Sequence, residues 1–305
     1  MNLLSRIIII GTLSSTFLGA ATVFAKDKKV ENTRIIVANV GFSTPESIEY
    51  YADEDVYLVS NLNGSSLKAA GNGFISKVKP DGSIIKLKWI DGTTKGIVLN
   101  SPKGIAIQGN KLFVADISQI HIFDLPSGQQ NASVDIKGST FLNGITPSAD
   151  GSVYVTDSGL KAGKEGYAPS GSDAIYKVWA NGQYELVFKD KFQGHPNGIV
   201  TDGKELIVVT FGSGKVFRVD TAGKRHALPA PPKGGLDGLL KLNDGRLLMS
   251  SWGESAIYEL HNNSYHILAD MLDSPADLGL DTKRNRLLIP LFKQDKLVFL
   301  PLKHL

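Results

Sequence analysis

Six residues occupy the same position in a short pattern that returns along the 305-residue chain, and their types suggest chemistry. They are Glu46, Lys103, Asn143, Asn197, Asp237 and Ala276. Two carry a carboxylate and two carry an amide, so four of the six offer a side-chain oxygen. Oxygen donors without sulfur or imidazole suit a hard cation, and Ca²⁺ matches this set best. If the fold brings these side chains together, the sequence predicts a divalent-metal site.

The same pattern has a second interpretation. In Pro196-Asn197-Gly198 and Leu236-Asp237-Gly238 the polar residue precedes glycine, and Asn-Gly and Asp-Gly are common turn dipeptides. The chain also contains Asn63-Gly64 and Asn181-Gly182 in segments typical of turns. For one isolated pair a turn is the simpler explanation, whereas a set of equivalent positions favours a shared site.

The spacing of the six positions predicts the fold. Three of the five intervals are about 40 residues long, and those after Glu46 and Asn143 are about 15 residues longer. Each position is followed by a turn signal and a strand-like run such as Leu206–Val209. A period of about 40 residues is typical of β-propeller blades with four strands each. Helical periodicity is absent after the N-terminal segment. The sequence therefore predicts an all-β, six-bladed propeller over residues 26–305, with the six positions at one end of its axis.

Two further features concern the ends and the loops of the ring. The last repeat ends after three strands, and the apolar segment Thr33–Val40 is expected to complete it as the outer strand beside Leu297–Pro301, which would remove an open edge. The two long intervals place insertions at Asn61–Gly73 and Ser158–Ser172. Both are expected to overhang the mouth of the central channel, although ordinary variation in loop length explains them equally well.

The segment Met1–Ala25 has the pattern of a secretory signal peptide. Arg6 is its only charge, an apolar stretch follows, and Val23-Phe24-Ala25 precedes a charged segment. A membrane anchor is the alternative. The chain has no cysteine, which excludes disulfides, thiolate metal sites, a cysteine nucleophile and a lipoprotein anchor. We expect cleavage after Ala25, a periplasmic or secreted protein, and no membrane span in the mature chain.

Composition limits the partners. The formal net charge is +3, and no run of basic residues stands out. A nucleic-acid partner is therefore not expected. A small molecule bound at the predicted channel mouth is the expected ligand.

The repeats and the ring residues resemble the senescence marker protein/gluconolactonase family, six-bladed propellers related to the paraoxonases. The resemblance covers about residues 33–305. It implies an axial divalent metal held by Glu46, Asn197 and Asp237, with Asn143 completing the site or touching substrate. It also implies hydrolysis of a lactone or related ester, for which Asp237 is the candidate general base.

Two ring positions depart from that family. Sugar lactonases of the family often carry Arg where this chain has Phe141, which argues against a gluconate-type substrate. Lys103 is expected to pair with Glu46, to repel the metal or to bind an anionic substrate group, unless it points out of the ring. These departures favour a non-catalytic, ligand- or protein-binding propeller as the alternative function.

Three aromatic residues beside the ring are assigned from their positions. His195 is expected to contact substrate above the channel, or else to be a solvated loop histidine. Trp252 and Phe211 lie in short loops at the same end and are expected to form apolar pocket walls.

Overall fold

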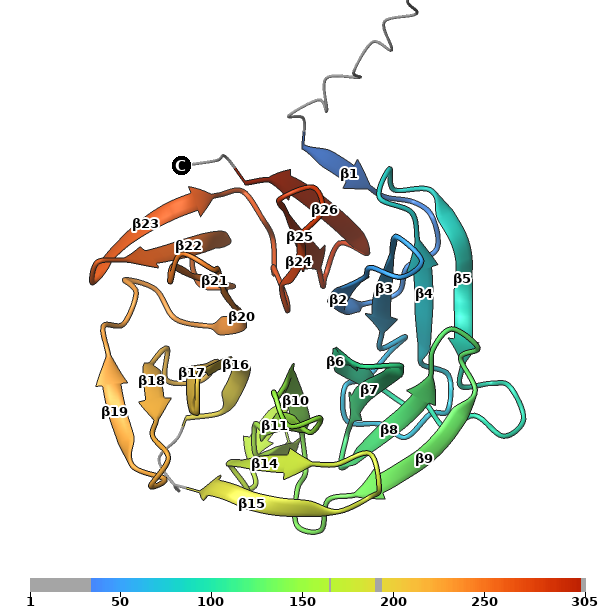
Figure 1. Ribbon diagram of the computed structural model, residues 1–305, viewed down its shortest axis with the longest axis horizontal. Helices are drawn as coiled ribbons and strands as arrows, with labels where there is room; N and C mark the ends of the chain where they lie inside the picture. The colour runs from blue at the N-terminus through green and yellow to red at the C-terminus, as the bar shows by residue number, and fades with distance from the viewer. Residues whose placement is uncertain (1–33, 165, 190–193, 303–305) are drawn as a thin grey trace, which may run out of the picture. The chain divides into compact units, whose positions relative to one another are not determined.

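The computed structural model describes residues 34–164, 166–189 and 194–302. The segment from Thr33 to Leu305 forms one compact unit. Within the described residues, six antiparallel four-stranded sheets surround a central axis, and no α-helix occurs (Figure 1). The all-β, six-bladed propeller predicted from the repeats is thus confirmed. Met1–Ala25, the predicted signal peptide, lies outside the described residues, and none of those described forms a helix long and apolar enough to cross a bilayer.

The strands follow one another outward from the axis in each blade. From the innermost outward, blade one contains β2 (Pro45–Tyr51), β3 (Val56–Asn61), β4 (Phe74–Val78) and β5 (Ile84–Asp91), and blade two contains β6 (Pro102–Gln108), β7 (Lys111–Asp116), β8 (Gln119–Asp124) and β9 (Gln130–Asp135). In the same order, blade three contains β10 (Leu142–Pro147), β11 (Val153–Asp157), β14 (Ala174–Val178) and β15 (Tyr184–Lys189), and blade four contains β16 (Pro196–Asp202), β17 (Glu205–Thr210), β18 (Val216–Val219) and β19 (Arg225–Leu228). Blade five contains β20 (Leu236–Lys241), β21 (Leu247–Ser251), β22 (Ala256–His261) and β23 (Ser264–Ala269), and blade six contains β24 (Gly279–Asp281), β25 (Arg286–Leu291), β26 (Lys296–Pro301) and β1 (Ile35–Val37).

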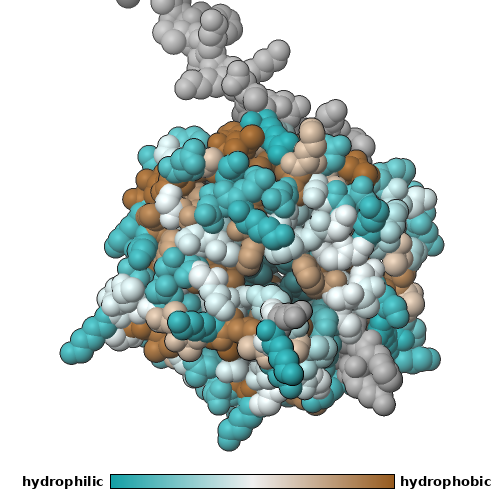
Figure 2. All heavy atoms as spheres, turned by 180° about the vertical axis from the view of Figure 1, so that it is seen from behind, coloured by the Kyte–Doolittle hydropathy of each residue, from teal (hydrophilic) through white to brown (hydrophobic). Residues whose placement is uncertain are grey.

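Apolar side chains fill the spaces between neighbouring blades. Phe113 and Ile120 of blade two, for example, share one buried cluster with Leu142 and Val155 of blade three. Complete burial of a large apolar side chain contributes roughly 1.5–3 kcal/mol. The outer strands are more exposed and carry polar residues together with exposed apolar ones such as Ile85 and Leu186, and Figure 2 shows an edge on which hydrophilic residues alternate with hydrophobic patches. The blades are therefore held together face to face, and the axis is left for other side chains.

The inner strands have a shared irregularity at the ring positions. In blade one, Pro45 pairs with Asn61 and Ile48 pairs with Val59, so the two residues Glu46-Ser47 oppose one residue of β3. The inner strands of blades two to five are interrupted at the same place. A bulge of this kind bends a strand and redirects its side chains. It explains why the second residue of each pattern faces the end of the channel.

The glycines after the ring residues allow the inner strands to approach one another. A Cβ on Gly104, Gly144, Gly198 or Gly238 would overlap backbone atoms of the next blade. None of these four glycines has a positive φ. The Asn-Gly and Asp-Gly pairs at positions 143, 197 and 237 therefore lie inside strands, and the turn interpretation is wrong for them.

The seam between blades six and one differs from the others. Ser47 and Asp277 occupy the places of the glycines, and the Ser47 hydroxyl donates to the Asp277 carboxylate at 2.9 Å. The backbone N–H of Asp277 also donates to the Glu46 carbonyl at 2.9 Å. Ala276, the sixth ring position, lies just before β24 instead of within it and contributes no polar side chain.

The ring closes as the sequence predicts. β1 pairs antiparallel with β26, with Ile35 opposite Phe299 and Val37 opposite Leu297. The strand is shorter than the predicted segment Thr33–Val40. Its Val37 is buried in a cluster with Phe299 and residues of blade one, so the closing strand joins both sides of the seam.

Candidate functional site

A cavity of about 290 Å³ lies where the ring residues of five blades converge. Its lining combines the predicted ligands with apolar groups from loops: Glu46, Leu62, Ser66, Lys103, Phe141, Asn143, Ser158, Leu160, Tyr167, Asn197, Phe211, Asp237, Trp252, Phe292 and Lys293. The structure thus brings together Glu46, Asn143, Asn197 and Asp237, together with Lys103, Phe141 and Trp252. Of the predicted site residues, His195 is the one that does not line this cavity.

Three of the four predicted ligands have an oxygen without a hydrogen-bond partner. These buried atoms are Oε2 of Glu46, Oδ1 of Asn143 and Oδ1 of Asp237. Buried polar atoms are nearly always hydrogen-bonded in folded proteins, so three such atoms around one cavity mark it as a candidate binding site. Because all three are oxygens, the atoms can accept a hydrogen bond or coordinate a cation.

The orientation of the Asn143 amide follows from its neighbours. The Ser158 hydroxyl donates to the Pro196 carbonyl at 2.6 Å, and it therefore accepts from Nδ2 of Asn143, which lies 3.1 Å away. The nitrogen of the amide is held toward Ser158, and its oxygen is left facing the cavity. Ser158 comes directly after β11, so blade three supplies both the amide and the group that orients it.

The two carboxylates influence each other. Burial raises the pKa of Glu46 well above its ordinary value; Asp237 and Asp277 raise it further, and Lys103 opposes the rise. Burial and the Asp277 carboxylate raise the pKa of Asp237 to about 8, against the opposing effect of Asn197 and Trp252. In the protein alone, both groups resist ionisation because water is excluded and negative charges are close. A bound cation would favour the charged form of both.

Lys103 is held inside the ring. Its side chain is 1% exposed, and its ammonium donates to the Ser101 carbonyl at 3.2 Å and lies 4.4 Å from the centre of the Phe141 ring. Burial lowers the pKa of Lys103 to about 8, although Asp116, Glu46 and Asp157 oppose this. The orientation out of the ring is therefore excluded. Within residues 34–164, 166–189 and 194–302, no carboxylate lies within 4.0 Å of the Lys103 ammonium, so the predicted pair with Glu46 is not formed there.

Aromatic side chains form one wall of the cavity. Phe211 packs edge to face on Trp252, with 5.2 Å between the ring centres, and Trp252 lies 5.2 Å from Phe292. Phe211 and Trp252 thus lie where the sequence places apolar wall residues. The indole nitrogen of Trp252 is buried without a hydrogen-bond partner, so it can donate to a bound molecule.

The two insertions meet over the cavity. The hydroxyl of Ser66 in the first insertion hydrogen-bonds the hydroxyl of Tyr167 in the second, and the Tyr167 ring packs edge to face on Phe141 at 5.9 Å. The second insertion contains a small hairpin, β12 (Leu160–Ala162) and β13 (Tyr167–Pro169), where the sequence indicates only a loop. Its strands are only three residues long, too short for a periodic signal. The insertions overhang the channel mouth as predicted.

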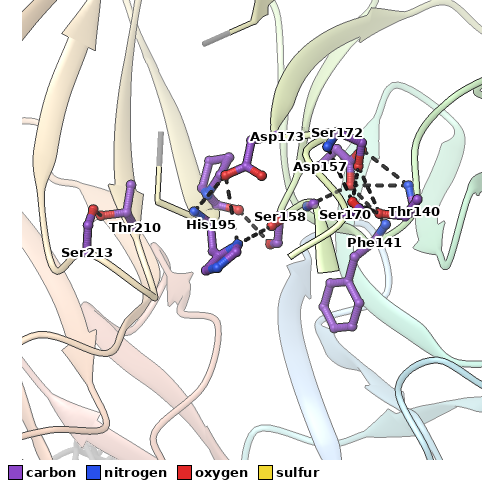
Figure 3. Close-up of polar contacts among 12 residues, drawn as sticks. Thr140, Phe141, Asp157, Ser158, Ser170, Ser172, Asp173, His195, Thr210 and Ser213 are labelled. Atoms are coloured by element: carbon purple, nitrogen blue, oxygen red, sulfur yellow. Dashed lines mark hydrogen bonds and ion pairs between the residues drawn. The ribbon is translucent and has the colours of Figure 1, made fainter. Parts of the chain in front are cut away.

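Hydrogen bonds fix the base of the second insertion (Figure 3). The hydroxyls of Thr140, Ser170 and Ser172 lie 2.8 Å from one another. Asp157 accepts from the backbone N–H groups of Thr140 and Phe141 beside them. The Phe141 backbone is thereby held in place where its ring enters the cavity.

His195 does not line the cavity and lies beside Ser158, which does (Figure 3). Its Nδ1 donates to the Ser158 carbonyl at 2.7 Å, and its backbone N–H donates to the Asp173 carboxylate at 2.9 Å. The side chain is partly exposed, at 22%. His195 thus supports Ser158, which in turn orients Asn143; it is neither a simple solvated histidine nor a lining residue of the cavity.

Several lining residues are not identified by the sequence analysis. Leu62, Ser158 and Phe292 each follow directly after the second strand of a blade, as the predicted Phe211 and Trp252 do. An alignment of the repeats at the residue after the second strand identifies all five of these residues. The others, Leu160, Ser66 and Tyr167, lie within the insertions, where no repeat guides the assignment, and Lys293 follows Phe292.

The donor set fits a hard divalent ion. Two carboxylates and two amides face the same cavity, and the orphaned oxygens belong to three of these four residues. Among the described residues, no group of three or more His, Cys, Asp or Glu side chains is arranged to hold a metal. Glu46, Asn143, Asn197 and Asp237 would therefore have to hold the ion together with water or substrate oxygens, as Ca²⁺ permits.

The comparisons with known proteins concern the fold. No protein-family model matches the chain, and no curated protein matches its sequence. Among solved structures, a gluconolactonase from Xanthomonas campestris is 19% identical, with a TM-score of 0.65 over 86% of this chain and 87% of the other. Virginiamycin B lyase from Staphylococcus aureus is 17% identical, with a TM-score of 0.58 over 89% and 99%. A propeller in the nidogen/laminin complex is 17% identical, with a TM-score of 0.56 over 73% and 78%. The chain shares a β-propeller fold with these proteins over most of its length, and such a fold hosts different functions. The expected likeness to a gluconolactonase holds at the level of fold.

Proposed function

We propose that this protein is a metal-dependent hydrolase of a lactone or related ester, with its divalent ion, most simply Ca²⁺, at the mouth of the axial channel. The observation that carries the proposal is the set of three buried, unpartnered oxygens of Glu46, Asn143 and Asp237 around one cavity. The gluconolactonase among the structural neighbours supports the reaction class by analogy.

The protein groups have separable tasks in this proposal. When bound, the ion supplies a Lewis acid that polarises the substrate carbonyl. Glu46 and Asp237 provide the negative charge that balances it, and Asn143, oriented by Ser158, provides a neutral oxygen. Asp237 accepts the proton of the attacking water. The Trp252 indole N–H lies beside Asp237 and favours its charged form.

The insertions and aromatic residues exclude water. Tyr167 and Ser66 join above the cavity, and Phe211, Trp252 and Phe292 form its side. Excluding water strengthens each electrostatic interaction inside the cavity. The aromatic residues of the lining favour an apolar substrate over a polyhydroxylated sugar, in line with Phe141 at the position where sugar lactonases often carry Arg.

Metal titration and hydrolysis together test the proposal. Calorimetry on chelator-treated protein is expected to detect one Ca²⁺ ion, and Asp237→Asn should weaken its binding at least tenfold, because a charged ligand is lost while the shape is kept. Asp202→Asn is the matched control: it removes a carboxylate that pairs with Arg218 and Lys241 and does not line this cavity. It should change affinity far less.

Hydrolysis of an aromatic lactone, dihydrocoumarin, and of phenyl acetate should require the ion and should fall with Asp237→Asn. Absence of both metal binding and hydrolysis would contradict the proposal. Metal and ligand binding without turnover would instead support the alternative of a ligand-binding propeller.

A further inference from the structure

Lys103 carries a buried ammonium with one described hydrogen-bond acceptor. An ammonium group has three N–H donors, and one described acceptor is present, the Ser101 carbonyl at 3.2 Å. Two of the acidic groups that influence it accept from other donors: Asp116 accepts from the backbone N–H of Ser101 at 2.8 Å, and Asp157 accepts from that of Phe141 at 2.9 Å. Two donors of a side chain that is 1% exposed are thus left toward the cavity.

The Phe141 ring compensates only part of the cost of burying this charge. The ammonium lies 4.4 Å from the ring centre, within the range of a cation–π interaction. Desolvating an ammonium costs several times what one such contact returns. A buried amine in this state is a ready partner for an anion that enters the cavity.

A second lysine lies at the rim. The ammonium of Lys293 is 4.9 Å from the centre of the Trp252 ring, and the side chain lines the same cavity. If the carboxylates of Glu46 and Asp237 balance a divalent ion, Lys103 and Lys293 remain without a counter-charge among the lining residues. With the ion bound, the cavity then favours a negatively charged ligand.

The apolar lining residues determine what the uncharged part of the ligand can be. Phe211, Trp252 and Phe292 form an aromatic wall, and Leu62 and Leu160 add aliphatic surface. An aromatic or otherwise apolar body fits these surfaces, whereas a sugar would leave its hydroxyl groups largely unpaired.

We infer that the cavity binds an aromatic or apolar carboxylate, with the carboxylate on Lys103, and that the substrate of this protein is an ester or lactone carrying such a group. The substrate part rests on the proposed hydrolase function, whereas the carboxylate site does not. Because its ammonium binds the carboxylate, Lys103 is the residue that distinguishes a negatively charged ligand from a neutral ligand of the same shape.

Binding of two isosteric probes tests the carboxylate site. Calorimetry would compare 2-naphthoate with 2-naphthamide, on chelator-treated and on Ca²⁺-loaded protein. Wild type should bind the carboxylate roughly tenfold more tightly, because a charge-assisted hydrogen bond replaces a neutral one. Lys103→Met keeps the apolar stem and should reduce the preference to less than twofold. Lys103→Arg should retain part of it.

Lys111→Met is the matched control, since the Lys111 ammonium pairs with Asp124 away from the cavity, at 3.1 Å. It should leave the preference unchanged. Equal binding of both probes by wild type would overturn the inference. So would a preference that survives Lys103→Met but disappears on chelation, because the ion would then be holding the carboxylate.

Hydrolysis separates this inference from the proposed function. The substrates are 2-naphthyl acetate and its 6-carboxy derivative. Faster turnover of the carboxylated ester by wild type, but not by Lys103→Met, supports both proposals. Equal turnover of the two esters would leave the hydrolase in place and overturn the carboxylate preference. A Lys103-dependent preference in binding without turnover of either ester would leave the carboxylate site in place and overturn the hydrolase.

Discussion

Asp55 of blade one and Arg284 of blade six form a bidentate ion pair across the seam where the ring closes. The two guanidinium nitrogens donate to the two carboxylate oxygens at 2.8 and 2.7 Å. Lys283 and the Tyr50 hydroxyl donate to the same carboxylate at 2.9 and 2.8 Å. The hydrogen bonds from Arg284, and then those from Lys283, hold the pKa of Asp55 well below its usual range.

Asp55→Asn is expected to lower the free energy of unfolding by about 1 kcal/mol at pH 7, a modest amount because the pair is partly exposed to solvent. A depressed carboxyl pKa stabilises the fold above the unfolded value near 4, and the contribution is lost as the pH falls below it. Urea unfolding at pH 7 and pH 3 would measure this. The difference between wild type and variant should shrink at pH 3, and an equal difference at both values would contradict the assignment.

The closing strand gives a second stability prediction. Val37 is 5% exposed in β1, whereas Ile36 next to it is 59% exposed. Val37→Ala should cost about 2 kcal/mol, because it leaves a cavity in the cluster around Phe299. Ile36→Ala serves as the control, and its cost should stay below about 0.5 kcal/mol, as for most surface substitutions. Denaturant midpoints would compare the two, and equal losses would show that β1 does not pack as described.

The glycine contacts at the axis predict a coupling between fold and site. A Cβ on Gly144 would overlap the carbonyl of Asn197, so Gly144→Ala should force blades three and four apart. We expect a loss of about 2–3 kcal/mol, as for overpacked core positions, and weaker Ca²⁺ binding. Ser47→Ala is the comparison, since it removes the two hydrogen bonds of the hydroxyl, to Asp277 and from the Ile105 N–H, and should cost about 1–2 kcal/mol. A fully stable Gly144→Ala protein would contradict the close approach.

The other end of the channel gives a pH-dependent prediction. A cavity of about 210 Å³ there contains Glu49, Asp277 and Lys241. Burial and the Asp277 carboxylate raise the pKa of Glu49 to about 8. A raised carboxyl pKa means that stability is lost as the pH rises from about 4.5 to 8. Glu49→Gln should therefore make the free energy of unfolding less dependent on pH over this range. It should raise the free energy of unfolding by about 1–2 kcal/mol at pH 8, a modest amount because partial solvent access screens the charge of Glu49. An unaltered pH profile would contradict this.

The contact between the insertions predicts a kinetic effect. Tyr167→Phe removes the hydrogen bond to Ser66 and keeps the ring against Phe141. Stopped-flow binding of 2-naphthoate should become faster in both directions. The free energy of unfolding should change by no more than about 0.5 kcal/mol, because Tyr167 is 55% exposed. Ser66→Ala should behave in the same way. Unchanged rates in both variants would show that the contact does not control entry.

The parts of the molecule that repeat were predictable from the sequence. Asn143, Asn197 and Asp237 could be placed at the axis because the regular period sets their blades in register. The closure by β1 followed from the missing outer strand of the last blade. Both inferences use periodicity, which depends on backbone geometry that every blade shares.

The unpredicted parts depend on contacts that do not repeat. The hydrogen bond between Ser66 and Tyr167 joins two insertions whose backbones follow no period. The position of His195 behind Ser158 depends on its left-handed backbone, with φ of 62°. Ala276 had an equivalent place in the repeat, yet β24 begins after it because Asp277 turns toward Ser47 at the seam.

The pairing of β1 with β26 has a consequence for biosynthesis. The ribosome produces Val37 long before its partner Leu297, so the closing strand has no partner while the intervening blades emerge. Pairing between such distant segments forms slowly, and unpaired strand edges promote aggregation in the meantime. Nascent chains that stop before Lys296 can complete no sixth blade. Premature termination is therefore expected to yield insoluble fragments instead of a smaller, stable propeller.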